Sequence, residues 1–358
     1  MGRRVQKYPS IFTAEGKHRL RLWLLRRVGG TRAGRWALAK CYRYDDPVLE
    51  REIFGVSFPN PIGISAGFDV DGRLYRQLKA LGWGFVEIGT LTPKPQNGNA
   101  RPRLFRLKAD RALINRIGFE NGGLEQALYN LRRRGERPAE RVGANIAKNT
   151  LTDLDGTVRD YLKMFRNLYQ YVDYFTLNIE PLIEQVTMEG GDVKSILLAV
   201  MDALVDFRRG QTDYCPILMK VSPDWDKALV DSIIEVLIET QLDGLVLGSA
   251  TYNHEGLKSS PRRLRKVGEG GLSGEPLFPY TVELLKYVRS RLPGHYPLIA
   301  SGGVMKPEDV QTLLDAGADL VQIYTGLIYN GAGFAKKICQ HLAMIAHHRK
   351  GTISPSIK

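Results

Sequence analysis

The sequence has few cysteines and no long apolar run, and both shortages exclude classes of protein. Its 358 residues include three cysteines, Cys41, Cys215 and Cys339, which lie far apart and form no C-x-x-C pair. This spacing suggests neither a zinc site nor an iron–sulfur cluster, so we expect no metal site and three unpaired thiols in a reducing cytosol. No apolar run approaches the ~20 residues that a membrane span needs. The N-terminal region also lacks the apolar core and cleavage site of a signal peptide.

Acidic residues are almost absent from the first 44 residues. This region carries twelve Lys and Arg against one acid, Glu15, and so holds a net charge of +11 of the chain's +13. Because the rest of the chain is nearly neutral, we do not expect a nucleic-acid-binding protein. A G-x-G-x-x-G motif opening a βαβ unit is also missing, so NAD or FAD on a Rossmann domain is not indicated.

The basic region predicts two short helices. Apolar residues between Glu15 and Val28 indicate the first, Gly29-Gly30 ends it, and Thr31 can cap a second helix that carries Trp36. A basic helix with Trp and Leu on its apolar side is typical of an element that lies on anionic lipid. The alternative is a helix that packs on the rest of the protein or at a dimer contact.

From Pro47 onward, short apolar runs alternate with segments of helical period. Eight such runs predict a closed parallel (β/α)8 TIM barrel in preference to a doubly wound sheet. We expect this barrel over residues 45–350, after a helical extension over 1–44 and before a frayed tail over 351–358. The runs are Pro61–Ala66, Gly84–Gly89, Val142–Ile146, Val172–Asn178, Pro216–Val221, Asp243–Leu247, Pro297–Ala300 and Ala318–Tyr324.

Polar and small residues follow these runs at the strand ends where barrels carry their chemistry. Asn145, Asn178 and Lys220 each end an apolar run, and Lys220 is notable because buried lysines need a partner. Such groups suit the hydrogen-bonding edge of a flavin, and a cation there favours its anionic reduced form. Gly302-Gly303 and Tyr324-Thr325, which end the last two runs, suit a single phosphate.

These residues closely resemble the membrane-associated, quinone-linked class 2 of the dihydroorotate dehydrogenase family. The resemblance covers roughly residues 8–345 and is strongest in Phe58–Asp69, Glu87–Gln96, Arg101–Arg106, Asn115–Phe119, Asn145–Asn149 and Gly270–Leu277. The resemblance implies that FMN binds to Ala66, Gly67, Thr90, Asn145, Asn178, Lys220, Gly248, Gly274, Gly303, Tyr324 and Thr325. The substrate would bind to Asn115, Arg116, Gly118, Phe119, Asn178 and Ser249.

The resemblance also implies a reaction and a location. The chain would oxidise dihydroorotate to orotate in pyrimidine biosynthesis and pass the electrons to a quinone. Residues 1–44 would form the quinone tunnel and contact the anionic membrane surface, which places the protein peripherally on the cytoplasmic side of the cell membrane.

The sequence departs from the family where the family binds orotate. Val70 stands where the family has the lysine that binds the orotate carboxylate. The family's next loop contains the serine base and a substrate-binding asparagine, and here that loop is Ile179-Glu180-Pro181. Gly248-Ser249-Ala250 stands where the family has Thr-Asn-Thr. The lysine cation is lost at Val70, and Glu180 adds a negative charge near the same pocket. We therefore expect this chain to bind the orotate anion poorly.

Three interpretations follow from these departures. The family's reaction survives with Glu180 as the base, helped by a raised pKa; or the enzyme uses a different, non-anionic substrate that Glu180 binds; or the chain is a non-catalytic FMN-binding scaffold. Glu180 as a solvent-facing loop acid without a role is the remaining alternative.

Overall fold

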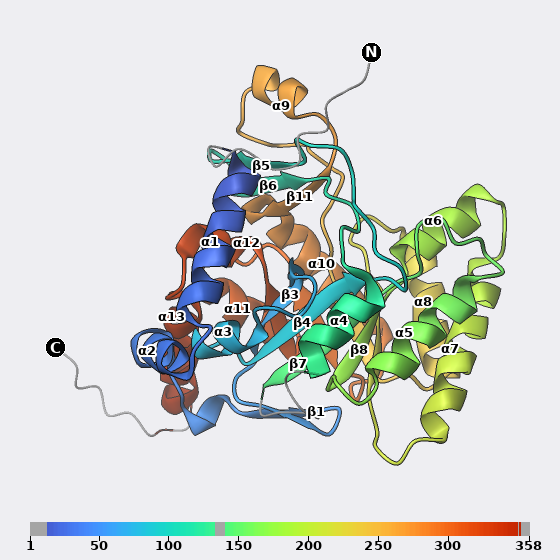
Figure 1. The fold of residues 1–358 in the computed structure, drawn as a ribbon, viewed down its shortest axis with the longest axis horizontal. Coiled ribbons are helices and arrows are strands. Elements are labelled where there is room, and N and C mark those ends of the chain that lie inside the picture. The colour runs from blue at the N-terminus through green and yellow to red at the C-terminus, as the bar shows by residue number, and fades with distance from the viewer. Residues whose placement is uncertain (1–12, 133–139, 350, 352–358) are drawn as a thin grey trace.

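The computed structural model describes residues 13–132, 140–349 and 351. Over these residues the chain forms a closed parallel barrel with helices around its outside (Figure 1). The barrel runs in the order β10-β12-β13-β3-β4-β7-β8-β9. Its strands are β3 (Ile62–Asp69), β4 (Phe85–Leu91), β7 (Arg141–Ile146), β8 (Tyr174–Asn178), β9 (Ile217–Val221), β10 (Gly244–Leu247), β12 (Leu298–Ser301) and β13 (Leu320–Ile323). The eight strands and the TIM-barrel prediction are thereby confirmed.

Helices follow the strands and bury their apolar sides against them. The ends are set by local signals: the Asp192 side chain accepts the backbone N–H groups of Lys194 and Ser195 at the start of one helix, and Pro307 occupies the first position of another. The outer helices are α3 (Tyr75–Ala80), α4 (Gly123–Arg132), α5 (Thr157–Leu168), α7 (Val193–Arg209), α8 (Lys227–Glu239), α10 (Phe278–Arg291), α11 (Pro307–Asp315) and α13 (Phe334–Arg349).

One end of the barrel is closed by the hairpin of β1 (Arg51–Ile53) and β2 (Val56–Phe58). Phe58 is fully buried there, with its ring 5.4 Å from that of Phe85 in an edge-to-face arrangement. Phe85, Tyr174 and Leu320 all stand at the first positions of their strands, so this apolar cluster fills the N-terminal end of the barrel. The functional site must therefore open at the opposite end.

A three-stranded antiparallel sheet lies over that opposite end. It consists of β5 (Leu104–Leu107), β6 (Ala112–Asn115) and β11 (Gly271–Gly274), with α9 (Pro261–Val267) beyond it (Figure 1). Two shorter helices, α6 (Glu180–Met188) and α12 (Thr325–Asn330), begin directly after barrel strands. The sequence did not indicate the sheet, because its strands are only four residues long and come from distant loops.

The two N-terminal helices are present as predicted. They are α1 (Ala14–Val28) and α2 (Arg32–Tyr42), and the Thr31 side chain accepts the Gly34 N–H as the expected cap. The helix α1 lies along the small sheet, and α2 packs on α3 (Figure 1). The boundary at residue 44 stays a prediction, and the tail expected over 351–358 lies outside the described residues apart from Gly351.

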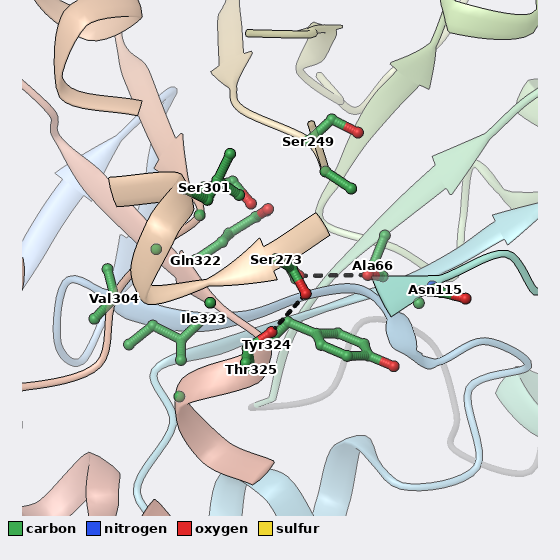
Figure 2. Close-up of a pocket in the computed structure, with 18 of the residues that line it drawn as sticks. Ala66, Asn115, Ser249, Ser273, Ser301, Val304, Gln322, Ile323, Tyr324 and Thr325 are labelled. Atoms are coloured by element: carbon green, nitrogen blue, oxygen red, sulfur yellow. Dashed lines mark hydrogen bonds between the residues drawn. The ribbon is translucent and has the colours of Figure 1, made fainter. Parts of the chain in front are cut away.

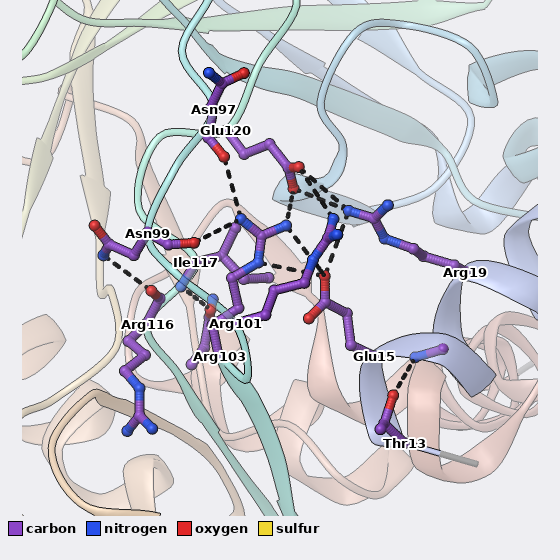
Figure 3. A network of polar contacts seen from close by, with 12 residues as sticks. Thr13, Glu15, Arg19, Asn97, Asn99, Arg101, Arg103, Arg116, Ile117 and Glu120 are labelled. Atoms are coloured by element: carbon purple, nitrogen blue, oxygen red, sulfur yellow. Dashed lines mark hydrogen bonds and ion pairs between the residues drawn. The ribbon is translucent and has the colours of Figure 1, made fainter. Parts of the chain in front are cut away.

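A buried ionic network fixes the start of α1 (Figure 3). The Glu15 carboxylate accepts from Arg103 Nη2 at 3.1 Å and from Arg101 Nε at 3.2 Å. Arg103, with a side chain only 2% exposed, also binds Glu120, which Arg19 of α1 contacts at 3.2 Å. Glu15 therefore ties α1 to the loop before β5, and Arg19 ties it to the segment after β6 through Glu120.

Candidate functional site

The C-terminal end of the barrel and the sheet above it enclose a cavity (Figure 2). Its walls come from the ends of β3, β9, β12 and β13, and from β6 and β11 of the small sheet. Seven of the residues predicted to bind a cofactor line it: Ala66, Gly67, Lys220, Gly274, Gly303, Tyr324 and Thr325. Asn115 and Ser249, predicted for the substrate, line it as well.

Glycines make one side of this cavity a cradle of bare backbone. Gly303 follows β12 with φ +76°, and a Cβ atom there would collide with the backbone of Phe278 at the start of α10. Gly274 ends β11 with φ +103°, and its Cβ would meet the carbonyl oxygen of Arg111. Both positions therefore require glycine, and the exposed peptide groups can approach an anion closely. Gly248, also predicted, has φ +118° and abuts the Ser301 carbonyl from outside the lining.

Hydroxyl groups stand beside the cradle. Ser273 Oγ and Thr325 Oγ1 lie 2.8 Å apart and join β11 to the start of α12 (Figure 2). Burial raises the pKa of Tyr324 to about 12, so its hydroxyl stays protonated and can donate. Hydroxyl donors next to open backbone suit a phosphate group.

Only one of the two polar atoms in the buried Gln322 amide has a hydrogen-bond partner. Its Nε2 donates to Glu87 Oε2 at 2.7 Å, whereas its Oε1 has no partner among the described residues. A fully buried acceptor without a partner is costly. Gln322 is among the lining residues of the cavity, and this oxygen itself is covered by neighbouring atoms.

Thr90, Asn145 and Asn178 form a hydrogen-bonded row across β4, β7 and β8. Thr90 Oγ1 donates to Asn145 Oδ1 at 2.7 Å, and Asn178 Nδ2 donates to Thr90 Oγ1 at 3.2 Å. The carboxylate of Glu87, fully buried inside the barrel, accepts from Asn145 Nδ2 at 2.9 Å and holds this amide in place. These three predicted residues are absent from the cavity lining, but Asn178 pairs in register with Lys220, which lines it.

Glu180 lies close to Lys220 at the edge of the cavity. It is the first residue of α6, and its backbone N–H donates to Asn178 Oδ1 at 3.4 Å, while its carboxyl group lies near Ser249. Burial raises the pKa of Glu180 to about 7, while the Lys220 ammonium opposes this shift and Glu184 and Asp224 add to it. The residue predicted as the base thus sits in a helix N-terminus, and it is not a solvent-facing loop acid.

The other residues predicted for the substrate lie on the segment after β6. Asn115 Oδ1 accepts the Ile117 N–H at 2.8 Å, which turns the chain, and Gly118 continues the turn with φ +73°. The Phe119 carbonyl accepts from Asn121 Nδ2 at 2.9 Å. Arg116 is directed elsewhere, because its guanidinium donates to the Val267 and Glu269 carbonyls at 2.6 and 2.7 Å. The structure therefore brings Asn115 to the cavity and leaves Arg116 at the end of α9.

The donor set of the cavity fits a ligand with an anion at one end and a hydrogen-bonding ring at the other. Sequence reasoning missed Ser273, Gln322 and Leu277 in its lining. Ser273 and Leu277 fall inside a stretch already singled out, so their proximity to Gly274 was an available signal. Nothing in the sequence identified Gln322 as a site residue, because it is only a single polar residue within an apolar strand.

Comparison with known proteins places the chain in a family. The family model described as dihydroorotate dehydrogenase matches residues 48–345. The dihydroorotate dehydrogenase (quinone) of Christiangramia forsetii is 41% identical over 302 residues, which cover 84% of this chain and 86% of that protein. The protein of the same name from Paraburkholderia phymatum is 37% identical over 336 residues, covering 93% of this chain and 95% of that protein.

Solved structures agree with these relatives. The crystal structure of DHODH from Eimeria tenella in complex with ferulenol has a TM-score of 0.82 and 28% identity, and it covers 97% of this chain and 94% of that chain. The ligand-free structure of the same protein also has a TM-score of 0.82, with coverage of 94% and 96%. With a matching family model over most of its length and curated relatives at 37–41% identity, the chain belongs to the dihydroorotate dehydrogenase family of oxidoreductases.

Proposed function

We propose that the chain is an FMN-dependent oxidoreductase that oxidises dihydroorotate or a related substrate and passes the electrons to a quinone. The observation that carries the proposal is the cavity, in which glycine backbone, two hydroxyls and a lysine converge within a dihydroorotate dehydrogenase fold. When bound, FMN would take two electrons from the organic substrate and release them to the quinone.

The chain's own residues have separate roles in this proposal. Gly274, Gly303 and Thr325 would hold the phosphate, because they offer open backbone and a hydroxyl donor. Lys220 would lie at the polar edge of the ring and balance the negative charge of the reduced cofactor. The row of Asn145 and Asn178 would supply amide donors and acceptors beside it.

A second cavity supports a quinone as the electron acceptor. This space of about 510 Å³ lies between α1, β5 and β6, and its lining includes His18, Leu104 and Phe105. Burial lowers the pKa of His18 to about 4, so the imidazole is neutral and compatible with an apolar ligand. Its ring packs edge-on against Phe68 at 5.4 Å, and Phe68 packs against Tyr324 of the first cavity at 5.7 Å. Aromatic side chains thus join the two cavities.

The outer side of the N-terminal helices supports contact with an anionic membrane surface. Trp23 of α1 and Trp36 of α2 are 55% and 66% exposed, among many Arg and Lys residues. In the described part of the chain, no helix is long and apolar enough to cross a membrane. We therefore propose a peripheral association through residues 1–44 on the cytoplasmic side of the cell membrane.

Anaerobic spectroscopy of the purified protein tests this function. The protein should carry FMN, and dihydroorotate at millimolar concentration should bleach the flavin absorbance if it is the substrate. A quinone should then restore the absorbance faster than oxygen does. Protein that neither carries nor takes up FMN would refute the proposal, whereas FMN that no quinone reoxidises would indicate a scaffold without catalysis.

A further inference from the structure

Glu180 occupies the part of the site where an organic substrate would meet the cofactor-binding lysine. It follows β8, and its backbone N–H donates to Asn178 Oδ1 at 3.4 Å. Asn178 pairs in register with Lys220 of the neighbouring strand β9, and Ser249 follows β10 on the other side of β9. Glu180 therefore stands beside the end of β9, near Lys220 and Ser249, which line the cavity.

The groups around Glu180 make this edge of the cavity electronegative. Glu184 lies one turn further along α6, and Asp224 lies just after β9, and both carboxylates act on Glu180. Asp224 is held in place by hydrogen bonds from Thr251 Oγ1 and the Tyr252 N–H. Lys220 is the one Lys or Arg among the lining residues that the structure describes. Glu184 and Asp224 thus add negative charge beside Glu180, and the one ammonium of the lining, Lys220, is the group assigned to the cofactor.

An anionic substrate has no free counter-charge at this edge. The residue after β3 is Val70, whose carbonyl accepts the Gly89 N–H and whose side chain is apolar. Like charges in a partly desolvated site repel strongly, whereas a carboxylate next to a serine hydroxyl accepts hydrogen bonds well. The edge therefore favours N–H donors and disfavours carboxylates.

We propose that Glu180, placed at the start of α6 beside Lys220, determines specificity, and that the substrate is an uncharged or cationic compound that presents an N–H donor to the Glu180 carboxylate and carries no carboxylate there. This inference rests on the proposed flavin-dependent activity and refines its substrate class. It separates the chain's substrate from dihydroorotate, whose carboxylate Glu180 would repel. A dihydropyrimidine ring without the carboxylate is a compound of the expected kind.

The test is a binding titration that needs no turnover. Orotate and uracil, which share a ring and differ in the carboxylate, are titrated into the oxidised holoprotein at pH 8, and the shift of the flavin spectrum is recorded. We expect Glu180→Gln to strengthen orotate binding at least about tenfold, which corresponds to removal of about 1.4 kcal/mol of repulsion. The same change should weaken uracil binding about fivefold, because a charge-assisted hydrogen bond becomes a neutral one. Glu184→Gln, the same change one turn along α6 on an exposed residue, should have a smaller effect.

Each outcome bears on one claim. Orotate binding at pH 8 that is equally tight in the wild type and in Glu180→Gln overturns the inference, and so does an equal gain in Glu184→Gln. Thermal unfolding and flavin content of both variants show whether they are folded. Purified protein that holds no flavin and takes up no FMN contradicts the proposed function itself, before either ligand is added.

Discussion

Replacing Gly303 by alanine should expel the cofactor, and the chain offers a matched control for this change. Gly303 and Gly331 have nearly the same positive φ, +76° and +77°. At Gly331 a Cβ would meet nothing within 4 Å, whereas at Gly303 it would overlap backbone and side-chain atoms of Phe278. Gly331 has ψ −171°, a region that is essentially restricted to glycine and costs other residues roughly 1–3 kcal/mol. The stiffer unfolded chain offsets roughly 0.4–1 kcal/mol of this cost, so we expect Gly331→Ala to lose about 1 kcal/mol of stability.

Gly303→Ala also carries a backbone cost for its positive φ, and an additional steric one. Because Phe278 begins α10, its backbone can yield only if the helix moves, and such overpacking adds about 1–3 kcal/mol. We therefore expect a loss of about 2–4 kcal/mol in urea unfolding, together with loss of flavin absorbance from the purified protein. Gly331→Ala should keep its flavin. Equal flavin retention in the two variants would refute the assignment of Gly303 to the phosphate cradle.

Four further changes test other parts of the structure. Lys220→Met should lower the two-electron potential of the flavin by about 30–60 mV, if the lost charge contributes about 1.5–3 kcal/mol to the reduced form. In the wild type, orotate affinity should rise as the pH falls through about 7, because Glu180 then becomes neutral, and Glu180→Gln should remove this dependence. Glu15→Gln should cost about 1–3 kcal/mol in urea unfolding, since Arg103 keeps one of its two carboxylate partners. Trp36→Ala should weaken sedimentation with vesicles that contain an anionic lipid, in proportion to the lost apolar area.

Controls and contrary results differ between these experiments. An unchanged potential in Lys220→Met would place the lysine away from the flavin ring. Orotate affinity that is flat between pH 6 and 8 would remove Glu180 from the substrate pocket. For the network, the exposed Glu50 provides a control as Glu50→Gln, and equal stability losses would show that burial of Glu15 is unimportant. If Trp36→Ala sediments with the vesicles as much as the wild type does, α2 packs on the protein and does not contact the lipid.

Strand periodicity predicted the barrel well because each strand is a continuous apolar run buried on both faces. The small sheet over the mouth was missed because β6 and β11 are short and pair over more than 150 residues of chain. Within the site, the residues Gly274 and Gly303 were predictable, since positive φ and close backbone contacts demand glycine. Gln322 was not, because its role depends on Glu87 from a strand that the sequence places 235 residues away.

The Glu180 environment also lay beyond sequence reasoning. The Asn178-Ile-Glu-Pro segment was read as a loop, whereas Glu180 begins α6 with Pro181 in its first turn. The proximity of Glu180 to Ser249 depends on the strand order, which places β8 and β10 on either side of β9. The sequence shows that residue 180 is acidic, but it does not show the neighbours that raise the pKa of Glu180.

Identification of the cofactor released from the purified protein tests the central claim most directly. The claim is that the cavity lined by Gly274, Gly303, Lys220 and Gln322 holds FMN. Denaturation of the wild-type protein should release FMN in about a one-to-one ratio to the chain, and Gly303→Ala prepared in the same way should release little. A colourless wild-type protein that gains no flavin spectrum when incubated with FMN would contradict the claim.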